Sequence, residues 1–247
     1  MSEDIIIGKN PVLEALRSHR DINKILIAEG SQRGQMHQIT ELAKEANAIV
    51  QYVPKKKIDQ LTEGNHQGVL AYVAAYKYAE VDDLFKAARE KGEEPFFLIL
   101  DEVEDPHNLG SIMRTADAVG AHGIIIPKRR AVGLTSTVAK ASTGAIEYVP
   151  VARVTNLART IEELKEQGVW IAGTDAKGSK DYRQQDFTLP LGLVIGSEGK
   201  GMGRLIREKC DFLVHLPMAG KVTSLNASVA AALLMYEVYR SRHPLGG

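Results

Sequence analysis

Apolar and polar positions alternate along the chain so that short buried strands can be told from amphipathic helices. In the second half, fully apolar runs lie between segments with helical periodicity. The expected strands are 96–100, 123–126, 169–174, 191–195 and 212–216, and the expected helices are 109–119, 135–142 and 225–242. Strands that are apolar throughout and alternate with helices are typical of a parallel sheet covered on both faces. We therefore predict a parallel-sheet α/β domain over residues 96–247.

The N-terminal part shows the same two patterns on a smaller scale. Strands are expected at 24–28, 49–53 and 69–74, and helices at 36–46 and after Asn10-Pro11, since proline is accepted at the first helical position. The segment 76–95 is highly charged, contains one expected helix (81–89) and ends in a Gly- and Pro-containing stretch. We predict a small α/β domain over residues 1–75 and a linker over 76–95.

Composition excludes several classes of protein. The 31 Lys and Arg residues balance 31 Asp and Glu residues, so the whole chain has no net attraction for nucleic acid, although local basic patches can still act. A single cysteine, Cys210, excludes an internal disulfide and a cysteine-based zinc site. No signal-peptide pattern begins the chain, and the longest apolar run (229–236) is far shorter than the ~20 residues that span a bilayer. We expect a cytoplasmic protein.

Three loops that follow expected strands are rich in polar and glycine residues. They cover residues 101–108, 196–203 and 217–226. In open parallel sheets, ligands bind beyond the carboxyl ends of the strands. The three loops are therefore expected to meet at one edge of the sheet and to form a site.

Each loop also has a structural alternative. In the first, Asp105-Pro106 is a turn signal and Asn108 a candidate helix cap, and the acidic residues lack the spacing of a metal site, so no metal is expected. The second fails both the dinucleotide and the P-loop patterns. In the third, capping of the last helix accounts for one of Ser224 and Asn226 but not for both. The residues alone do not name the ligand.

The same loops resemble, in order and spacing, the three motifs of the SpoU/TrmH family of RNA ribose methyltransferases. As they stand here, the motifs are Asn108-x-Gly110-x-x-x-Arg114-x-Ala116, Leu193-Val194-Ile195-Gly196-Ser197-Glu198-Gly199-x-Gly201, and Leu216-Pro217-Met218 through Ser224-Leu225-Asn226-x-Ser228-x-Ala230. Upstream, Gly8-Lys9-Asn10-Pro11-Val12-x-Glu14-Ala15-Leu16 and Gln67-Gly68-Val69 resemble the family's N-terminal substrate-binding domain, which is similar to ribosomal protein L30e. Within the family, the chain is most similar to the RlmB type, which methylates a guanosine of 23S rRNA.

The resemblance implies a fold and an activity that periodicity does not. It implies a deep trefoil knot (the SPOUT fold) in the second domain, where general topology rules would exclude a threaded chain. It further implies a homodimer that uses S-adenosylmethionine to methylate a ribose 2′-hydroxyl during rRNA processing. The implied catalytic residues are Asn108, Arg114, Glu198, Ser224 and Asn226, and the implied cofactor-binding residues are Thr174, Gly196, Leu216 and Leu225.

An arginine that is always protonated cannot serve as a base. We therefore interpret Arg114 as a clamp on substrate phosphate and a stabiliser of developing oxyanion charge, with a substrate phosphate accepting the proton. Glu198 is either the base or, as we favour, a residue that orders its loop and pairs with Arg114. The basic triplets 55–57 and 128–130 are candidates for RNA backbone contacts, although charge runs also form solvated surfaces.

Three other functions compete with 23S rRNA guanosine methylation. The same chemistry on a tRNA nucleoside is the nearest alternative. A non-catalytic RNA-binding protein with this fold would be expected to lack Arg114 or Asn226, and both are present. A nicotinamide-dependent dehydrogenase is supported only by the glycines of residues 199–203. Binding of S-adenosylmethionine or of a nicotinamide dinucleotide separates these functions.

Overall fold

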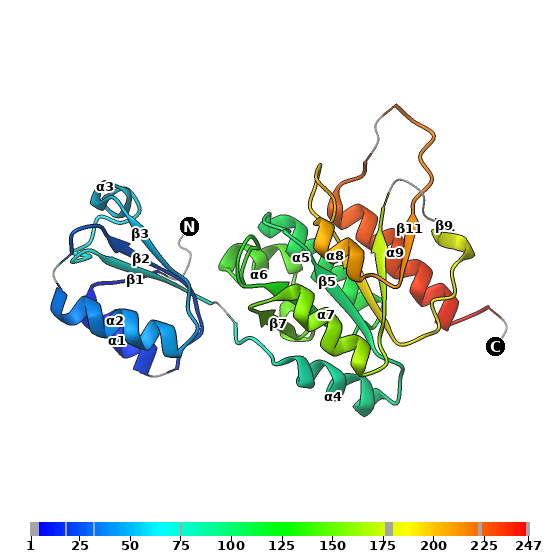
Figure 1. The fold of residues 1–247 in the computed structure, drawn as a ribbon, viewed down its shortest axis with the longest axis horizontal. Helices are drawn as coiled ribbons and strands as arrows, with labels where there is room; N and C mark the ends of the chain where they lie inside the picture. The colour runs from blue at the N-terminus through cyan, green and yellow to red at the C-terminus, as the bar shows by residue number, and fades with distance from the viewer. Residues whose placement is uncertain are drawn as a thin grey trace. The chain divides into compact units, whose positions relative to one another are not determined.

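The computed structural model describes residues 5–17, 19–31, 33–74, 76–175, 180–221 and 224–245. The chain divides into two compact units (Figure 1). The first takes in the residues up to Lys77, and the second takes in most of the residues from Tyr78 onward.

The first unit is a four-stranded sheet with two helices on one face and a short helix against the other. Its elements are β1 (Ile5–Ile7), α1 (Lys9–Arg17), β2 (Ile22–Ala28), α2 (Arg33–Glu45), β3 (Val50–Val53), α3 (Lys55–Asp59) and β4 (Val69–Val73), with strand order β1-β4-β2-β3. Successive residues of a strand point to opposite faces. Ile25 and Ile27 accordingly pack under α1 and α2, whereas Leu26 packs with Ile58 of α3.

The second unit contains a seven-stranded sheet in which every pair of neighbouring strands is parallel. Its elements are α4 (Val81–Lys91), β5 (Phe96–Leu100), α5 (Pro106–Ala118), β6 (Gly123–Pro127), α6 (Ser136–Ser142), β7 (Val151–Val154), α7 (Leu157–Glu166), β8 (Trp170–Thr174), β9 (Lys180–Asp181), β10 (Leu191–Ile195), α8 (Arg204–Lys209), β11 (Phe212–His215) and α9 (Ala227–Arg242), with 3-10 turns at Ala145–Glu147 and Tyr182–Gln184. The strand order is β7-β6-β5-β10-β8-β11-β9. The parallel α/β architecture predicted from the sequence is confirmed, and the trefoil knot stays a prediction.

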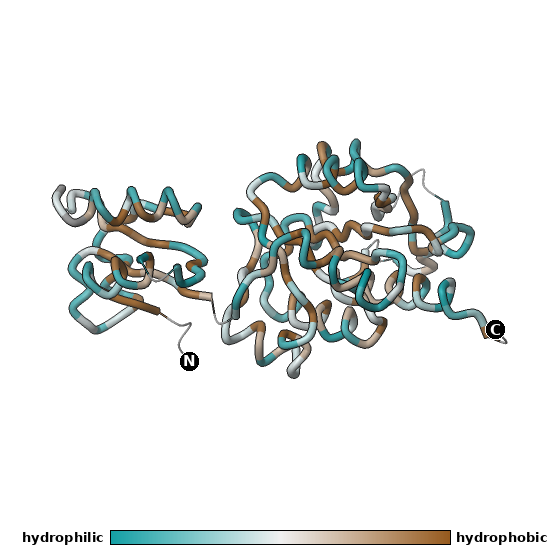
Figure 2. The backbone as a smooth tube through the Cα atoms, turned by 90° about the horizontal axis from the view of Figure 1, so that it is seen from below, coloured by the Kyte–Doolittle hydropathy of each residue, from teal (hydrophilic) through white to brown (hydrophobic). Residues whose placement is uncertain are grey.

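Helices cover both faces of this sheet. Side chains from α4, α7 and α8 share one core with the strands, while α5 and α9 pack together on the other face, with α9 against β10 (Figure 1). Figure 2 shows hydrophobic segments running through the interior of the unit. The structure adds β7 and α7. Arg153 interrupts the apolar pattern of the four-residue strand β7, whereas α7 has apolar residues at helical spacing (Leu157, Ile161 and Leu164) that we did not assign to a helix from the sequence. In the described part of the chain, no helix is long and apolar enough to cross a membrane.

The segment predicted as a linker contributes a helix to the second unit. Leu84 and Phe85 of α4 are buried in its core, and the Phe85 ring meets the Phe97 ring edge-on with 4.9 Å between centroids. Just before α4, the Ala79 amide donates to the Val151 carbonyl oxygen at 2.9 Å. The charges that indicated a linker lie on the exposed face of an amphipathic helix, so the second unit begins well before Phe96.

Arg242 links the end of α9 by hydrogen bonds to the segment just before β5. Its guanidinium donates to the carbonyl oxygens of Glu94 (2.7 Å) and Pro95 (3.1 Å), and to two more carbonyls in the segment 187–189. It also lies over the Phe96 ring, 5.4 Å from the centroid. The C-terminal helix is thus held at its far end by a charged group that satisfies several backbone acceptors at once.

Candidate functional site

The carboxyl ends of β5, β10, β8 and β11 are neighbours at one edge of the sheet. Leu100 pairs with Ile195 where β5 and β10 end, and Thr174 pairs with Val214 where β8 and β11 end. From β5 the chain adds β6 and β7 on one side, whereas β10 lies on the other side. The loops after β5 and β10 therefore flank the point where the strand order reverses, which is the usual ligand position in open α/β sheets.

A cleft of about 310 Å³ opens between these loops and the beginning of α9. Its lining combines the acidic first loop, the glycine-rich second loop and the first residue of the last helix. The residues are Glu102, Val103, Glu104, Asp105, Asn108, Ser197, Glu198, Lys200 and Ala227. No group of three or more His, Cys, Asp or Glu side chains arranged for a metal ion occurs in the described ranges.

Asn108, Glu198 and Asn226 meet in one hydrogen-bond network beside the cleft. The Asn108 side-chain amide donates to Glu198 Oε1 at 3.0 Å, and the Asn226 amide donates to Asn108 Oδ1 at 3.1 Å and to the same Glu198 oxygen. The backbone amide of Ala227 also donates to Glu198 Oε1, at 3.2 Å. One carboxylate oxygen thus ties together three segments that are far apart in the sequence.

Asn226 performs two structural tasks with the two ends of its side chain. Its Oδ1 caps α9 by accepting from the Ser228 amide at 2.9 Å and from the Ser228 hydroxyl at 2.6 Å, which leaves Nδ2 for the network. The cap of α5 is Asp105, whose carboxylate accepts from the His107 amide at 2.8 Å. The interpretation of Asn108 as a helix cap is therefore wrong: Asn108 lies inside α5, buried, and turns its amide towards Glu198.

The glycine-rich loop that carries Glu198 is a tight turn held at both ends. Ser197 and Gly201 exchange backbone hydrogen bonds of 3.1 and 3.0 Å, and a Cβ on Gly196 would lie 2.3 Å from the Gly201 carbonyl carbon. The loop ends where the Gly203 amide donates to the Asp101 carboxylate at 2.6 Å. Burial raises the pKa of this Asp101 carboxyl above its ordinary value, and the hydrogen bond from Gly203 opposes that shift.

Arg114 does not join this network within its own chain. It is exposed on α5, it is not among the residues that line the cleft, and no ion pair joins it to Glu198 in the described part of the chain. Six residues of helix place Arg114 about 9 Å along the axis and about 120° around it from Asn108. The pairing of Glu198 with Arg114 that we favoured from the sequence does not occur among the described residues of this chain.

The remaining predicted residues lie at the strand ends. Thr174 ends β8, Gly196 follows β10, and Leu216 follows β11, so all three lie at adjacent positions along the edge, half-buried. Leu225 is half-buried just before α9, and Ser224 beside it is exposed. Val222 and Thr223 of the third loop lie outside the described residues.

Sequence reasoning missed two residues that hold the site together. Asp101 fastens the glycine-rich loop, and the Ser228 hydroxyl holds the Asn226 side chain. A signal for Asp101 exists, because an acidic residue directly after a fully buried strand needs a hydrogen-bond donor. Ser228 stands in the third motif, but only the cap geometry shows what its hydroxyl does.

The two basic triplets differ in their surroundings. Lys55, Lys56 and Lys57 form the first turn of α3 and are all exposed. In the second triplet, Arg130 pairs with Glu102 at 2.7 Å, and burial lowers the pKa of the Lys128 ammonium. The first triplet is thus a cationic surface, whereas part of the second is engaged within the chain.

Comparisons with known proteins agree with this geometry. Residues 95–236 match the SpoU rRNA methylase family, and residues 5–79 match the RNA 2′-O ribose methyltransferase substrate-binding family. A TrmH family tRNA/rRNA methyltransferase of Bacillus subtilis (strain 168), YacO, is 71% identical over 243 residues, 98% of each chain. One of Staphylococcus aureus (strain MSSA476) is 56% identical over 246 residues, 100% of this chain and 99% of that one.

Solved structures show the same similarity over most of the chain. The SpoU methyltransferase AviRb from Streptomyces viridochromogenes, in complex with the cofactor AdoMet, has a TM-score of 0.61 and 27% identity, covering 96% of this chain and 90% of its own. An AdoMet-bound rRNA methyltransferase from Sinorhizobium meliloti has a TM-score of 0.60 and 28% identity, covering 96% and 86%.

Proposed function

Because the chain belongs to the SpoU/TrmH family and is an S-adenosylmethionine-dependent RNA methyltransferase, we propose that it methylates the ribose 2′-hydroxyl of a guanosine in 23S rRNA. The observation that carries the proposal is the network of Asn108, Glu198 and Asn226 beside the cleft at the strand-order reversal. The match of residues 5–79 to a 2′-O ribose methyltransferase substrate-binding family supports ribose rather than base as the target. Such an enzyme would act in the cytoplasm, in rRNA processing.

The strand ends fit the cofactor. Thr174, Gly196, Leu216 and Leu225 offer backbone groups, one hydroxyl and two half-buried leucine side chains, with no charged side chain among them. An adenosine needs hydrogen bonds at its ring edge and apolar contact on its faces, and small-molecule sites combine these two features. S-adenosylmethionine supplies the methyl group and its own leaving group. Residues of this chain must therefore bind it and orient the ribose.

We assign positioning to the network and charge stabilisation to Arg114. Oε1 of Glu198 accepts three hydrogen bonds, so its carboxylate holds the first and third loops in register. The Arg114 guanidinium is exposed and has no ion-pair partner among the described residues, so it is available to a substrate phosphate. A planar guanidinium binds phosphate through two parallel hydrogen bonds and stabilises oxyanion charge. A substrate phosphate accepts the proton from the ribose hydroxyl. Ser224 is exposed just before α9.

The experiment that tests the substrate is a map of 2′-O-methylated nucleotides in 23S rRNA and tRNA from a deletion strain and its parent. We expect one guanosine of 23S rRNA to lose its ribose methyl group and to regain it when the gene is restored. Purified protein with S-adenosylmethionine should methylate the same nucleotide in vitro. Loss of a tRNA methyl group instead would favour the tRNA alternative, which the names of the tRNA/rRNA methyltransferase relatives keep open. Methylation of a base would overturn the proposal.

We also propose a homodimer formed through α9. Four large apolar side chains on α9 are exposed at helical spacing: Val229 (47%), Leu233 (45%), Tyr236 (54%) and Tyr239 (41%). A contiguous apolar stripe of this kind marks an interaction surface, and a two-fold axis lets the same stripe cover itself. Light scattering at micromolar concentration should give the mass of two chains. Leu233→Glu with Tyr236→Glu should give one, and a monomeric wild-type protein would refute the dimer.

A further inference from the structure

The first unit contains a cleft of its own. It has a volume of about 580 Å³, within the range of roughly 300–1,000 Å³ that holds small ligands, and so has room for a nucleoside. It lies among the loops that follow β1 and β2, the loop that precedes β4, and α3. The side chains used below are Lys9, Glu29, Lys55, Asp59, Glu63 and His66.

Hydrogen bonds within the first unit hold the residues at the floor of this cleft in place. His66 is buried, its Nε2 lies 2.7 Å from Asp59 Oδ1, and its Nδ1 accepts from the Gly68 amide at 3.0 Å. Gln67 has a left-handed backbone (φ +49°), and its side-chain oxygen accepts from the Lys9 amide at 3.1 Å. A non-glycine residue in that region is uncommon and persists where surrounding contacts hold it. The floor is thus fixed before any ligand arrives.

The charges around the cleft favour a nucleobase over a phosphate. Lys9 and Lys55 are outnumbered by Glu29, Asp59 and Glu63, and three carboxylates would repel an anion. Asp59 is engaged by His66, but the carboxylates of Glu29 and Glu63 are exposed and have no hydrogen-bond or ion-pair partner among the described residues. Such carboxylates are acceptors for base N–H groups.

Guanine fits these acceptors best among the four RNA bases. Its Watson–Crick edge presents imino and amino N–H donors side by side, whereas uracil presents a single imino donor between two acceptors. Proteins that read RNA sequence do so on unpaired bases that are turned out of the helix. Phosphates beside such a base would meet the exposed Lys56 and Lys57 on α3, next to the cleft.

We propose that this cleft binds one unpaired guanine of the RNA substrate, with Glu29 and Glu63 accepting from its Watson–Crick edge. The proposal rests on the proposed function, because it takes RNA as the substrate. The inference concerns recognition of this base by the first unit, and it is separate from methyl transfer at the cleft beside Glu198 in the second unit. The first unit therefore selects the RNA by a single base as well as by charge.

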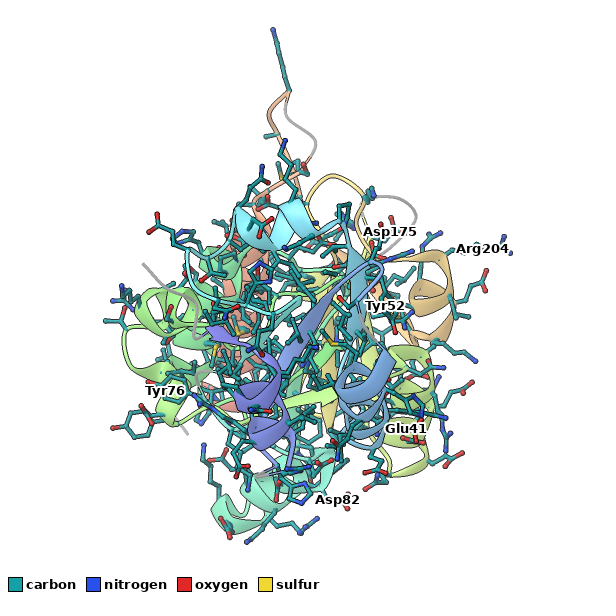
Figure 3. All side chains as sticks on the ribbon, turned by 90° about the vertical axis from the view of Figure 1, so that its left-hand side faces the viewer. Glu41, Tyr52, Tyr76, Asp82, Asp175 and Arg204 are labelled. Atoms are coloured by element: carbon teal, nitrogen blue, oxygen red, sulfur yellow. The ribbon has the colours of Figure 1, made fainter. Side chains whose placement is uncertain are left out.

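The test uses the full-length protein and an RNA hairpin with one unpaired nucleotide in its stem, made in four versions with G, A, C or U at that position. Dissociation constants are measured by fluorescence anisotropy at fixed salt for the wild type, Glu29→Gln, Glu63→Gln and the control Glu41→Gln. Glu41 is exposed on α2 and lies well away from α3 (Figure 3). Thermal unfolding of each variant shows whether it is folded.

We expect the G hairpin to bind most tightly, and each pocket variant to weaken that complex about tenfold, as expected for loss of a good base-edge contact. Binding of the U hairpin should change little, and Glu41→Gln should behave as wild type on all four. Equal binding of the four hairpins by the wild type, or pocket variants that match Glu41→Gln, would overturn the inference. Mapping of the methylated atom is independent: a base-methylated product would refute the proposed function while leaving the hairpin series valid.

Discussion

At the scale of single residues, the site depends on how one carboxylate distributes its hydrogen bonds. One oxygen of Glu198 accepts hydrogen bonds from the side chains of Asn108 and Asn226 and from the Ala227 amide. These partners come from two other segments of the chain. A general base must instead reach the proton that it removes. The geometry therefore supports the interpretation that Glu198 orders the site.

Glu198→Gln separates the two roles. A glutamine oxygen can still accept from the Asn108 amide and from the Ala227 amide, so we expect methyl transfer within about tenfold of wild type, whereas a lost base typically costs about 10²–10⁴-fold. Glu198→Ala removes the acceptor and should lower the rate about 100-fold or more through disorder of the loops. Single-turnover rates with saturating cofactor measure both. If Gln and Ala variants are equally inactive, Glu198 acts as the base.

His122 gives stability a pH dependence. Its imidazole is buried, Nδ1 accepts from the Phe96 amide at 3.0 Å, and Nε2 lies 3.1 Å from a Glu93 oxygen. Burial lowers the pKa of this imidazole below its ordinary value of 6.5, although Glu93 opposes the shift. Well above pH 6.5 both the folded and the unfolded chain carry a neutral His122. Below it the unfolded chain takes up a proton that the folded chain resists, so stability falls as pH falls.

We therefore expect the midpoint of thermal unfolding to fall between pH 6.5 and pH 5, and this fall to be smaller in His122→Gln than in wild type. His37→Gln is the matched control, because His37 is exposed on α2. The measurement is the unfolding midpoint at half-unit steps of pH, compared as slopes. A slope in His122→Gln equal to that of the His37→Gln control would contradict the assignment.

At the scale of elements, α5 approaches α6 closely at Gly110, two residues after Asn108. A Cβ on Gly110 would lie 2.4 Å from the Ala141 Cβ and 2.9 Å from the Ala141 carbonyl carbon. Backbone atoms cannot rotate away as a flexible side chain does. The glycine of the first motif thus serves a helix–helix contact about half a turn from Asn108 of the network.

Gly110→Ala should destabilise the protein although alanine is the better helix former. The propensity gain of ~1 kcal/mol is opposed by overpacking that typically costs about 1–3 kcal/mol, so we expect a net loss of roughly 1 kcal/mol or more. Gly34→Ala on α2 is the control, since no atom lies within 4 Å of its added Cβ, and it should be neutral or stabilising. Urea unfolding gives both free energies. Equal gains in both variants would refute the packing argument.

At the scale of the whole molecule, we expect that the second unit folds as an isolated fragment only if the fragment includes α4. A fragment 78–247 keeps α4, whereas a fragment 96–247 loses Leu84 and Phe85 from the core. Removing one large core side chain typically costs ~2–5 kcal/mol, and a whole domain has only about 5–15 kcal/mol. We expect 78–247 to unfold cooperatively and to bind S-adenosylmethionine as the full chain does, and 96–247 to do neither. Calorimetry on both fragments measures thermal unfolding and S-adenosylmethionine binding. A fragment 96–247 that is stable and binds the cofactor would contradict the role of α4.

The position of Arg114 makes a prediction about the dimer. Because it lies about 120° around α5 from Asn108, and α5 packs beside α9, we expect it to serve the site of the second chain. Inactive Arg114→Ala and Asn226→Ala proteins, unfolded and refolded together, would then form mixed dimers with one intact site. Random pairing should restore roughly a quarter of the wild-type rate per chain. No recovery, with mixed dimers shown to be present by mass spectrometry, would place Arg114 in its own chain's site.

The sequence by itself determined the local structure and the list of chemical groups. Continuous apolar runs and helical periodicity predict most strands and helices of both units, because burial on two faces or on one stripe is a local pattern. The three polar loops and their motif residues are likewise visible in the sequence. Helix α4 shows the limit: its pattern predicts a helix, yet its charges point to a linker.

Only the tertiary structure decided which groups meet. Strand β10 lies beside β5 because of long crossover connections, which no local periodicity in the sequence predicts. This strand order places Glu198 within hydrogen-bond distance of Asn108. In the same arrangement Asn226 both caps α9 and joins the network, and Arg114 is not among the residues that line the cleft of its own chain. Local interactions determine which segments form helices and strands. The order of the strands depends instead on how the apolar faces of all these elements are buried together. For that reason the sequence does not show which site residues meet.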